Sequence, residues 1–262
     1  MHRYICLCYS ATRIHERFCM SIIPDVLWLN TSPSLQCFHR PLLCYLSHHL
    51  TVAQWDYCQT QDEPSSLDVA LELLDDYLQS CDRPVHLIGH STSGLLGLLY
   101  ARRYPDKVKS LTLFAVGVDS ALDWQAHYYN HRKIMTRQKV LTSMAYNLFG
   151  SQDKCIINSL INRLQKDLYC SLSPHSFLQR VSLPASGVPV PLMICGGTDD
   201  IIIESADLLS WQEHFKSGDR LWLCPQGKHF FHYFQYQLVG EQLIDFWQFT
   251  HQSALLHASL LL

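Results

Sequence analysis

The sequence of 262 residues has little charge and no concentration of it. Charged residues make up 16% of the chain, and 20 Lys and Arg stand against 23 Asp and Glu, a net charge of -3. No run of basic residues offers a phosphate-binding face, so nucleic acid is not expected as a partner. No stretch approaches the roughly 20 apolar residues that span a bilayer, and the apolar ending 255–262 is too short. We therefore expect no integral membrane segment.

Metal and disulfide motifs are also missing. The 11 cysteines form no C-x-x-C pair and are scattered from Cys6 to Cys224, a pattern typical of reduced thiols in a cytoplasmic protein. Among the 15 histidines, His48 and His49 are adjacent and His229 and His232 are three apart, without acidic or cysteine partners at ligand spacing. We expect a cytoplasmic protein without metal or cofactor.

The chain is long enough and apolar enough to fold around one core. Hydrophobic residues make up 48% of it, and a chain of this size buries about three quarters of the surface that it exposes when unfolded. The run Tyr4 to Tyr9 lies in a segment, 1–25, without an amphipathic pattern, which predicts a leader or an edge strand. Residues 251–262 are expected to form a tail.

Short apolar runs alternate with amphipathic segments from residue 26 onward, which is typical of a parallel sheet with helices on both faces. The expected strands are Val26 to Leu29, Thr51 to Trp55, Val85 to Ile88, Ser110 to Val116, Leu192 to Cys195 and Leu221 to Cys224. The expected helices are about 65–78, opened by the capping pair Ser65 and Asp68, then 92–104, 204–215 and 236–249. The fold class is therefore α/β, a mostly parallel sheet flanked by helices.

The interval 119–187 is too long for a single crossover and interrupts the core, 26–118 and 188–250. Its helical patterns are Trp124 to Met135, Gln138 to Phe149, Lys154 to Tyr169 and Ser176 to Val181. Such an insertion would lie above the ends of the strands, where open α/β sheets bind their ligands, and we expect it to act as a lid. The interval also contains a cluster of basic residues: Arg132, Lys133, Arg137 and Lys139. We interpret this cluster as a solvated helix face; if it faced inward, it would favour an acidic acyl substrate.

The segment from Val85 to Gly94 reads as an apolar strand, a glycine-containing turn and a helix. A serine at such a turn, here Ser91, has its hydroxyl raised above the sheet and the following N–H, that of Thr92, directed to the same place. The pattern G-x-S-x-G has a second glycine where this chain has Ser93, although Gly94 follows directly. This geometry predicts a nucleophile.

A serine nucleophile needs a base, and the base needs a carboxylate that orients it. Asp199 and Asp200 follow the strand that ends at Cys195, and His229 follows the strand that ends at Cys224. The chain order Ser, Asp, His is that of the α/β hydrolases.

These motifs identify the chain as resembling the α/β-hydrolase fold superfamily over about residues 26–249. Gly-His-Ser-Thr-Ser-Gly, Ala-Arg-Arg-Tyr-Pro at 101–105 and Lys-His-Phe-Phe-His at 228–232 are similar to motifs of uncharacterised cyanobacterial hydrolases. The resemblance implies Ser91 as nucleophile, Asp200 as acid and His229 as base, with Asp200 preferred to Asp199 because Gly197 matches the glycine of Gly-x-x-Asp. Some relatives place the acid after the preceding strand, where this chain has Asp119 and Asp123.

The loop after the first core strand departs from these relatives. They have His-Gly-x-Pro-Gly, whereas this chain has Asn-Thr-Ser-Pro-Ser at 30–34, so that Pro33 matches and the His-Gly pair does not. The resemblance implies an oxyanion hole made by the N–H groups of Thr92 and Ser32. Because Thr31 adopts glycine conformations only with strain, the Ser32 N–H is expected either in place, rotated away, or replaced by the side chain of Asn30.

Taken together, the motifs predict a serine hydrolase of a small or medium carboxylic ester, thioester or lactone, acting through an acyl-enzyme on Ser91. The partner expected is a small-molecule acyl substrate, and the sequence does not indicate an oligomeric state. Two alternatives stay open: a ligand-binding or receptor-like protein with a slow triad, which the missing His-Gly motif favours, and an acyltransferase, which forms the same acyl-enzyme.

Overall fold

In the computed structural model, which describes residues 4–9, 23–59, 62–63, 65–119, 123–176 and 184–259, the strands form one sheet. Among these residues seven strands are paired in the order β1-β3-β2-β4-β5-β6-β7, and every pair is parallel. The strands are β1 (Tyr4–Tyr9), β2 (Val26–Asn30), β3 (Val52–Tyr57), β4 (Val85–His90), β5 (Val108–Phe114), β6 (Leu192–Gly197) and β7 (Arg220–Cys224).

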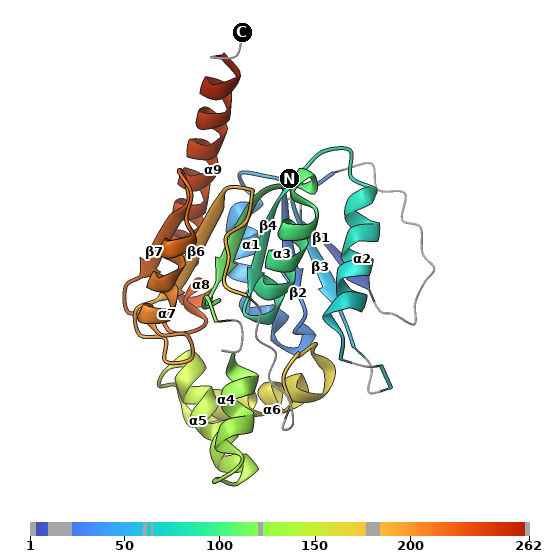
Figure 1. Cartoon of the computed structure of the whole chain (residues 1–262). Helices are drawn as coiled ribbons and strands as arrows, with labels where there is room; N and C mark the ends of the chain where they lie inside the picture. Colours follow the sequence, from blue (N-terminus) through green and yellow to red (C-terminus); the bar gives the residue numbers. More distant parts are fainter. Residues whose placement is uncertain are drawn as a thin grey trace.

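Helices cover both faces of the sheet (Figure 1), and the strands between them are continuous apolar runs because neither face meets water. Every residue of β2, β3 and β4 is buried. The helices are η1 (Pro33–Phe38), α1 (Arg40–Leu46), α2 (Leu67–Gln79), α3 (Thr92–Arg103), η2 (Pro105–Lys107), α4 (Trp124–His131), α5 (Arg137–Phe149), α6 (Lys154–Cys170), α7 (Ser205–Leu209), η3 (Ser210–His214), α8 (Phe231–Phe234) and α9 (Tyr236–Ser259).

The direction in which the chain adds strands reverses between β2 and β4. Strand β3 pairs with one edge of β2. The chain then crosses to the other edge of β2, where β4, β5, β6 and β7 follow in order. In open α/β sheets a crevice forms at the carboxyl ends of the strands where this reversal occurs. The residues that follow β2 and β4 therefore meet in one place, and these are the loop 30–34 and the serine turn at 91.

Helices α4, α5 and α6 form the interval between β5 and β6 and lie together at the end of the sheet away from the projecting helix α9 (Figure 1). Their apolar sides pack on one another through buried residues such as Leu141, Leu148 and Leu164. We refer to residues 123–176 as the α4–α6 insertion. The helix expected at Ser176 to Val181 lies, except for its first residue, outside the described part of the chain.

Several sequence expectations need correction. The cap of α2 is Ser66, whose hydroxyl accepts a hydrogen bond from the Asp68 N–H, whereas the Ser65 hydroxyl donates to the carbonyl oxygen of Ser173. Helix α9 continues to Ser259, so most of the expected tail is helical, since no glycine or proline follows Gly240. Of the two forms expected for Tyr4–Tyr9, a leader or an edge strand, the structure has the edge strand, paired with β3; residues 10–22 lie outside the described residues.

Candidate active site

Ser91 occupies a sharp turn between β4 and α3. Its backbone has φ 53° and ψ -126°, a region that costs a residue with a side chain about 1–3 kcal/mol. The turn is held by the Ser91 N–H, which donates to the carbonyl oxygen of Phe114 on β5 at 2.9 Å, and by the Ser91 carbonyl, which accepts from the Leu95 N–H at 3.0 Å. The surrounding backbone thus fixes a strained conformation that raises this side chain above the sheet.

Two glycines make the turn geometrically feasible. A Cβ at Gly89 would stand 2.4 Å from the carbonyl oxygen of Ser93, and a Cβ at Gly94 would stand 2.5 Å from Val116 Cγ2 and 2.9 Å from the carbonyl oxygen of Gly89. All three distances are below 3.0 Å, which Cβ atoms in proteins essentially never show, so a side chain at either position would force the neighbouring atoms to move. Gly94 therefore provides the close approach of helix to strand, and the position of Ser93 is left available for a hydroxyl.

Asp200 and His229 form a buried pair on the loops that follow β6 and β7. His229 Nδ1 lies 2.8 Å from Asp200 Oδ2, and both side chains are completely shielded from solvent. The other oxygen of Asp200 accepts hydrogen bonds from the N–H groups of Ile202 and Ile203, at 2.8 and 3.3 Å. Because the carboxylate is held from both sides, it fixes His229 with Nδ1 protonated and Nε2 available as an acceptor.

The two loops that carry this pair are bonded to each other. The Asp199 N–H donates to the carbonyl oxygen of Gly227 at 2.9 Å, and the Gln226 N–H donates to Thr198 Oγ1 at 2.8 Å. A Cβ at Gly197 would stand 2.0 Å from the Gly227 carbonyl oxygen, so the backbones touch. Asp200 and His229 are therefore held by one bonded pair of loops at the carboxyl ends of β6 and β7.

The other candidate acids have different positions. Asp199 is exposed and accepts from the Thr198 hydroxyl. Asp123 is the N-cap of α4, where its Oδ1 accepts from the Ala126 N–H at 2.6 Å and its Oδ2 accepts from the Thr92 hydroxyl at 3.2 Å. His175 Nε2 lies 3.6 Å from the same Oδ2. Asp123 thus joins the insertion to the serine turn.

Ser91 Oγ and His229 Nε2 are both buried atoms without a hydrogen-bond partner among the described residues. Leaving a buried polar group unsatisfied costs about 1–3 kcal/mol. Folded proteins tolerate such unsatisfied groups where the groups bind a ligand or take part in a reaction. These are the two atoms that a serine nucleophile and its base would use.

The loop after β2 is tied down by its own side chains. Asn30 is buried, and its amide donates to Asp56 Oδ1 at 2.6 Å while its Oδ1 accepts from the Ser32 N–H at 3.1 Å. The side chain of Asn30 is therefore turned to Asp56 on β3, which rules it out as a replacement donor in this conformation. The Ser32 N–H is present at the pocket but is bonded to Asn30, as in an Asx turn.

Thr31, within this loop, contacts Ser93 at the start of α3. Ser93 Oγ accepts from the Thr31 N–H at 2.9 Å and lies 3.0 Å from the Thr31 hydroxyl. Both residues are buried. The hydroxyl pair joins the loop after β2 to the first turn of α3.

Neutral histidines pack beside the serine. His90 Nε2 lies 3.0 Å from the carbonyl oxygen of His229, and His39 Nδ1 lies 3.0 Å from His232 Nε2. Burial lowers the pKa of His39 to about 3, and burial together with the neighbouring imidazoles lowers the pKa of His90 and His232 well below the usual value. Sequence reasoning missed this cluster; the histidine inside Gly-His-Ser was its one signal.

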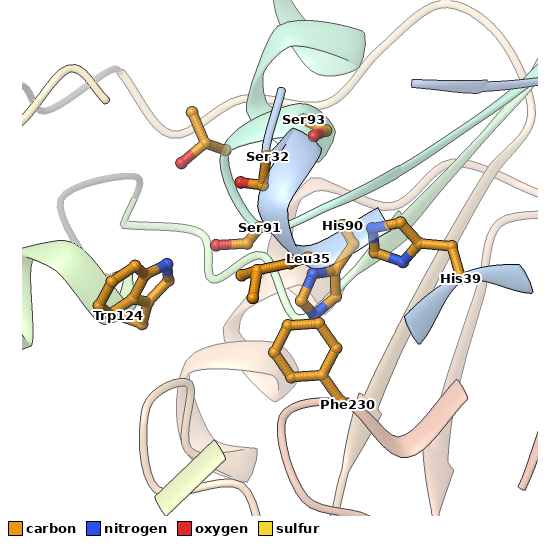
Figure 2. Close-up of a pocket in the computed structure, with 9 residues that line it drawn as sticks. Ser32, Leu35, His39, His90, Ser91, Ser93, Trp124 and Phe230 are labelled. Atoms are coloured by element: carbon orange, nitrogen blue, oxygen red, sulfur yellow. The ribbon is translucent and has the colours of Figure 1, made fainter. Parts of the chain in front are cut away.

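A small pocket opens above Ser91. Figure 2 shows the Ser91 hydroxyl turned toward the side on which Trp124 lies, with His90 and Phe230 on the other side. The space between its lining atoms, open solvent included, is about 320 Å³. The lining residues come from the loop after β2, from η1 and the residue that follows it, from the end of β4 with the serine turn and α3, from α4, and from the loop after β7: Ser32, Leu35, His39, His90, Ser91, Thr92, Ser93, Trp124 and Phe230. Among the described residues, no group of three or more His, Cys, Asp or Glu side chains is arranged to hold a metal ion.

Asp167 of α6 is a second buried contact between the insertion and the body. It accepts a hydrogen bond from the hydroxyl of Ser34 at 2.5 Å and is completely buried. Burial raises its pKa to about 6, against the opposing effect of hydrogen bonds, Ser34 first. The neighbouring Arg163 donates to the Ser34 carbonyl oxygen at 3.2 Å, so α6 is anchored on the first turn of η1.

Comparison with known proteins supports the fold and gives near relatives. Residues 28–240 match the alpha/beta hydrolase family. An uncharacterized protein from Nostoc sp. is 47% identical over 87% of this chain and 92% of its own length, and one from Synechocystis sp. is 47% identical over 85% and 90%. The solved structure of a thermophilic esterase superposes with a TM-score of 0.65 at 15% identity, covering 87% of this chain and 91% of the esterase.

Proposed function

This chain belongs to the α/β hydrolase family, and from that premise we propose that it is a serine hydrolase in which Ser91 is the nucleophile, His229 the base and Asp200 the acid. The observation that carries the proposal is the Asp200–His229 pair at 2.8 Å, which leaves His229 Nε2 as a buried acceptor. Neither His229 Nε2 nor Ser91 Oγ has a hydrogen-bond partner among the described residues. A nucleophile and a base with no other occupation are what acyl transfer requires.

In this mechanism Ser91 Oγ attacks the carbonyl carbon of the substrate while His229 Nε2 takes the hydroxyl proton. Asp200 stabilises the imidazolium and keeps Nδ1 protonated. The tetrahedral intermediate collapses when His229 gives the proton to the leaving group, which leaves an acyl-enzyme. Water, activated by the same imidazole, then attacks the acyl carbon and releases the acid and the serine hydroxyl.

The oxyanion formed in this step needs donors. The Thr92 N–H is the first of α3 and has no partner within the helix, and Thr92 Oγ1 is held by Asp123. The second donor in this proposal is the Ser32 N–H, which Asn30 Oδ1 occupies at 3.1 Å. An oxyanion would have to compete with Asn30 for it, so activity is expected to be lower than that of relatives with His-Gly.

The substrate class in this proposal is a carboxylic ester, thioester or lactone with a small or medium acyl group. The cavity above Ser91 is small, about 10 Å³ apart from its opening to solvent, which favours an acyl group of limited size. Trp124, Leu35 and Phe230 supply apolar walls. We assign the α4–α6 insertion as a lid because Trp124, its second residue, lines the pocket.

The test is labelling by a fluorophosphonate probe, followed by peptide mapping. Wild-type protein should be labelled on Ser91, Ser91→Ala should not be labelled, and Ser93→Ala should keep the label. Hydrolysis of p-nitrophenyl esters of two to twelve carbons then defines the acyl length. Absence of both labelling and hydrolysis, in protein with an intact thermal transition, would overturn the proposal and favour a receptor-like protein. Labelling with acyl transfer to an added alcohol in place of hydrolysis would favour an acyltransferase.

A further inference from the structure

The α4–α6 insertion carries an excess of positive charge on its surface. Residues 123–176 contain seven Lys and Arg and three Asp, whereas the whole chain has more acidic than basic residues. Two of the three acids, Asp123 and Asp167, are buried in contacts with the body of the protein. Asp153 is therefore the only exposed acid of the insertion. A chain with a net charge of -3 thus presents one basic region.

The charge is densest in the turn after α4 and the first residues of α5. Four of the seven basic residues lie in residues 132–139, whose sequence is Arg-Lys-Ile-Met-Thr-Arg-Gln-Lys. At the centre of this group Ile134 is 84% exposed, the most exposed large apolar side chain among the described residues. The turn is at the end of the insertion farthest from the sheet (Figure 1). We refer to residues 132–139 as the basic turn.

Within the described part of the chain, the basic side chains of this turn have no acidic partner. None of them forms an ion pair with a described residue. Two of them are ordered by neighbouring groups, since Arg132 donates to the Met135 carbonyl oxygen at 2.5 Å and the Arg137 guanidinium lies 5.2 Å from the ring centre of Tyr169 on α6. Tyr169 is 53% exposed and adds an aromatic ring beside the turn. Lys133 and Lys139 are exposed.

An apolar tip surrounded by cations fits the interface of an anionic bilayer. Lipid headgroups attract each nearby Lys or Arg, the long cationic side chains reach back to the phosphates, and an apolar residue between them enters the acyl region. A tyrosine at the same level suits the headgroup zone. A convex tip buries little area against a folded protein, whereas a stable protein interface needs about 1,000 Å² or more. The shape therefore favours a lipid surface.

We propose that the basic turn, with Ile134 inserted, is the site by which this protein binds membranes that contain anionic phospholipids. Helix α4 connects this turn directly to the pocket, since Trp124 at its first position lines the space above Ser91. Docking through the turn places the pocket on the membrane side of the molecule. The proposal concerns binding alone and stands whether or not Ser91 is the nucleophile.

The test is co-sedimentation of the full-length Ser91→Ala protein with vesicles, which excludes any effect of turnover. Vesicles of phosphatidylcholine are compared with vesicles that contain 30% phosphatidylglycerol, at 50 and 300 mM NaCl. Binding should require phosphatidylglycerol and weaken at the higher salt. Lys133→Glu with Lys139→Glu should reduce affinity at least 25-fold, because one cation near such a surface contributes about fivefold. Ile134→Ser should reduce it several-fold at both salt concentrations.

Matched controls place the same changes elsewhere on the surface. Lys109→Glu, at an exposed position on β5, and Leu209→Ser, at a residue 45% exposed on α7, should bind as the parent does. Equal binding to both kinds of vesicle, no binding to either, or unchanged binding after the Lys133 and Lys139 reversals would overturn the proposal. Salt-dependent binding to poly-glutamate without vesicle binding would assign the turn to an acidic protein instead.

Discussion

The Thr31 N–H donates a hydrogen bond to Ser93 Oγ at 2.9 Å, and the two hydroxyl groups lie 3.0 Å apart. Each residue stands where the motif of similar hydrolases has a glycine, one in the loop after β2 and the other in the turn after Ser91. The two departures are therefore one structural feature, in which a hydroxyl pair replaces two hydrogen atoms and connects the loop to the helix.

The first prediction concerns this pair. Thr31→Gly removes one hydroxyl and Ser93→Gly removes the other, and each single variant should lose about 1–2 kcal/mol in its free energy of unfolding, because a buried hydroxyl loses its partner. The double variant should lose less than the sum, by about 0.5 kcal/mol or more. Urea denaturation of the four proteins measures this coupling. Strict additivity would mean that the pair acts only through local backbone preference.

The second prediction concerns the proposed triad. Ser91→Ala should lower turnover of an activated ester by about 10⁴- to 10⁶-fold, and Asp200→Asn by about 10⁴-fold, because triad members act as a unit. Asp199→Asn is the matched control and should keep most of the activity, since Asp199 is exposed and bonded to Thr198. Single-turnover kinetics on all three variants makes the comparison. Equal losses in the two aspartate variants would remove Asp200 from the role.

The third prediction concerns the Ser32 N–H. Replacing Asn30 and Thr31 by His and Gly removes the acceptor that occupies this N–H, and the rate of ester hydrolysis should rise about 100-fold if one oxyanion donor is regained. Ser93→Gly is included in the same variant to avoid an unpaired hydroxyl. An unchanged rate, together with good activity of the natural protein, would show that Asn30 already yields the donor to substrate.

The fourth prediction concerns stability at acid pH. Burial, together with Lys109, lowers the pKa of His86 to about 3. Below pH 6.5 the unfolded chain binds a proton that the folded chain does not, so stability present above pH 6.5 is lost as the pH falls toward 3. His86 alone contributes about 2 kcal/mol of this loss at pH 5. His86→Gln should flatten the dependence of unfolding free energy on pH, whereas Ser110→Ala, which keeps the imidazole, should not.

The fifth prediction concerns Asp167, whose pKa burial raises to about 6. Here the folded chain binds a proton that the unfolded chain has lost, so stability falls as the pH rises from about 4 to 6 and stays lower above it. Asp167→Asn should therefore stabilise the protein by about 1–3 kcal/mol at pH 8 and much less at pH 4.5. Asp153→Asn, at an exposed position, is the control. A stabilisation that is independent of pH would contradict the argument.

The sequence predicted the arrangement of the core because its signals are local. Continuous apolar runs indicated buried parallel strands, and the glycines at 89 and 94 indicated the turn that holds Ser91. The same reasoning found the loops that carry Asp200 and His229, because each directly follows a strand whose carboxyl end lies at the same edge of the sheet.

Other features depend on partners distant in sequence. The bond between the Ser32 N–H and Asn30 could have been suspected from an Asx turn, but the turn of Asn30 toward Asp56 depends on the pairing of β2 with β3. The N-cap of α2 is Ser66 and not the expected Ser65, because the Ser65 hydroxyl is bonded to Ser173, 108 positions away. The cluster of His39, His90 and His232 joins three separate segments. No periodicity in a single sequence reports such contacts.

The mutual bonding of the loops after β6 and β7 has a consequence for how this protein can change. Because Gly197 and Gly227 hold these loops together, the separation of Asp200 and His229 is set mainly by the body of the protein. The α4–α6 insertion contacts the second of these loops where the Phe230 N–H donates to the Leu148 carbonyl oxygen at 3.4 Å and the rings of Phe149 and Phe230 stack. An exchange of the insertion that keeps these two contacts is therefore expected to change the wall of the pocket and to leave the Asp200–His229 distance as it is.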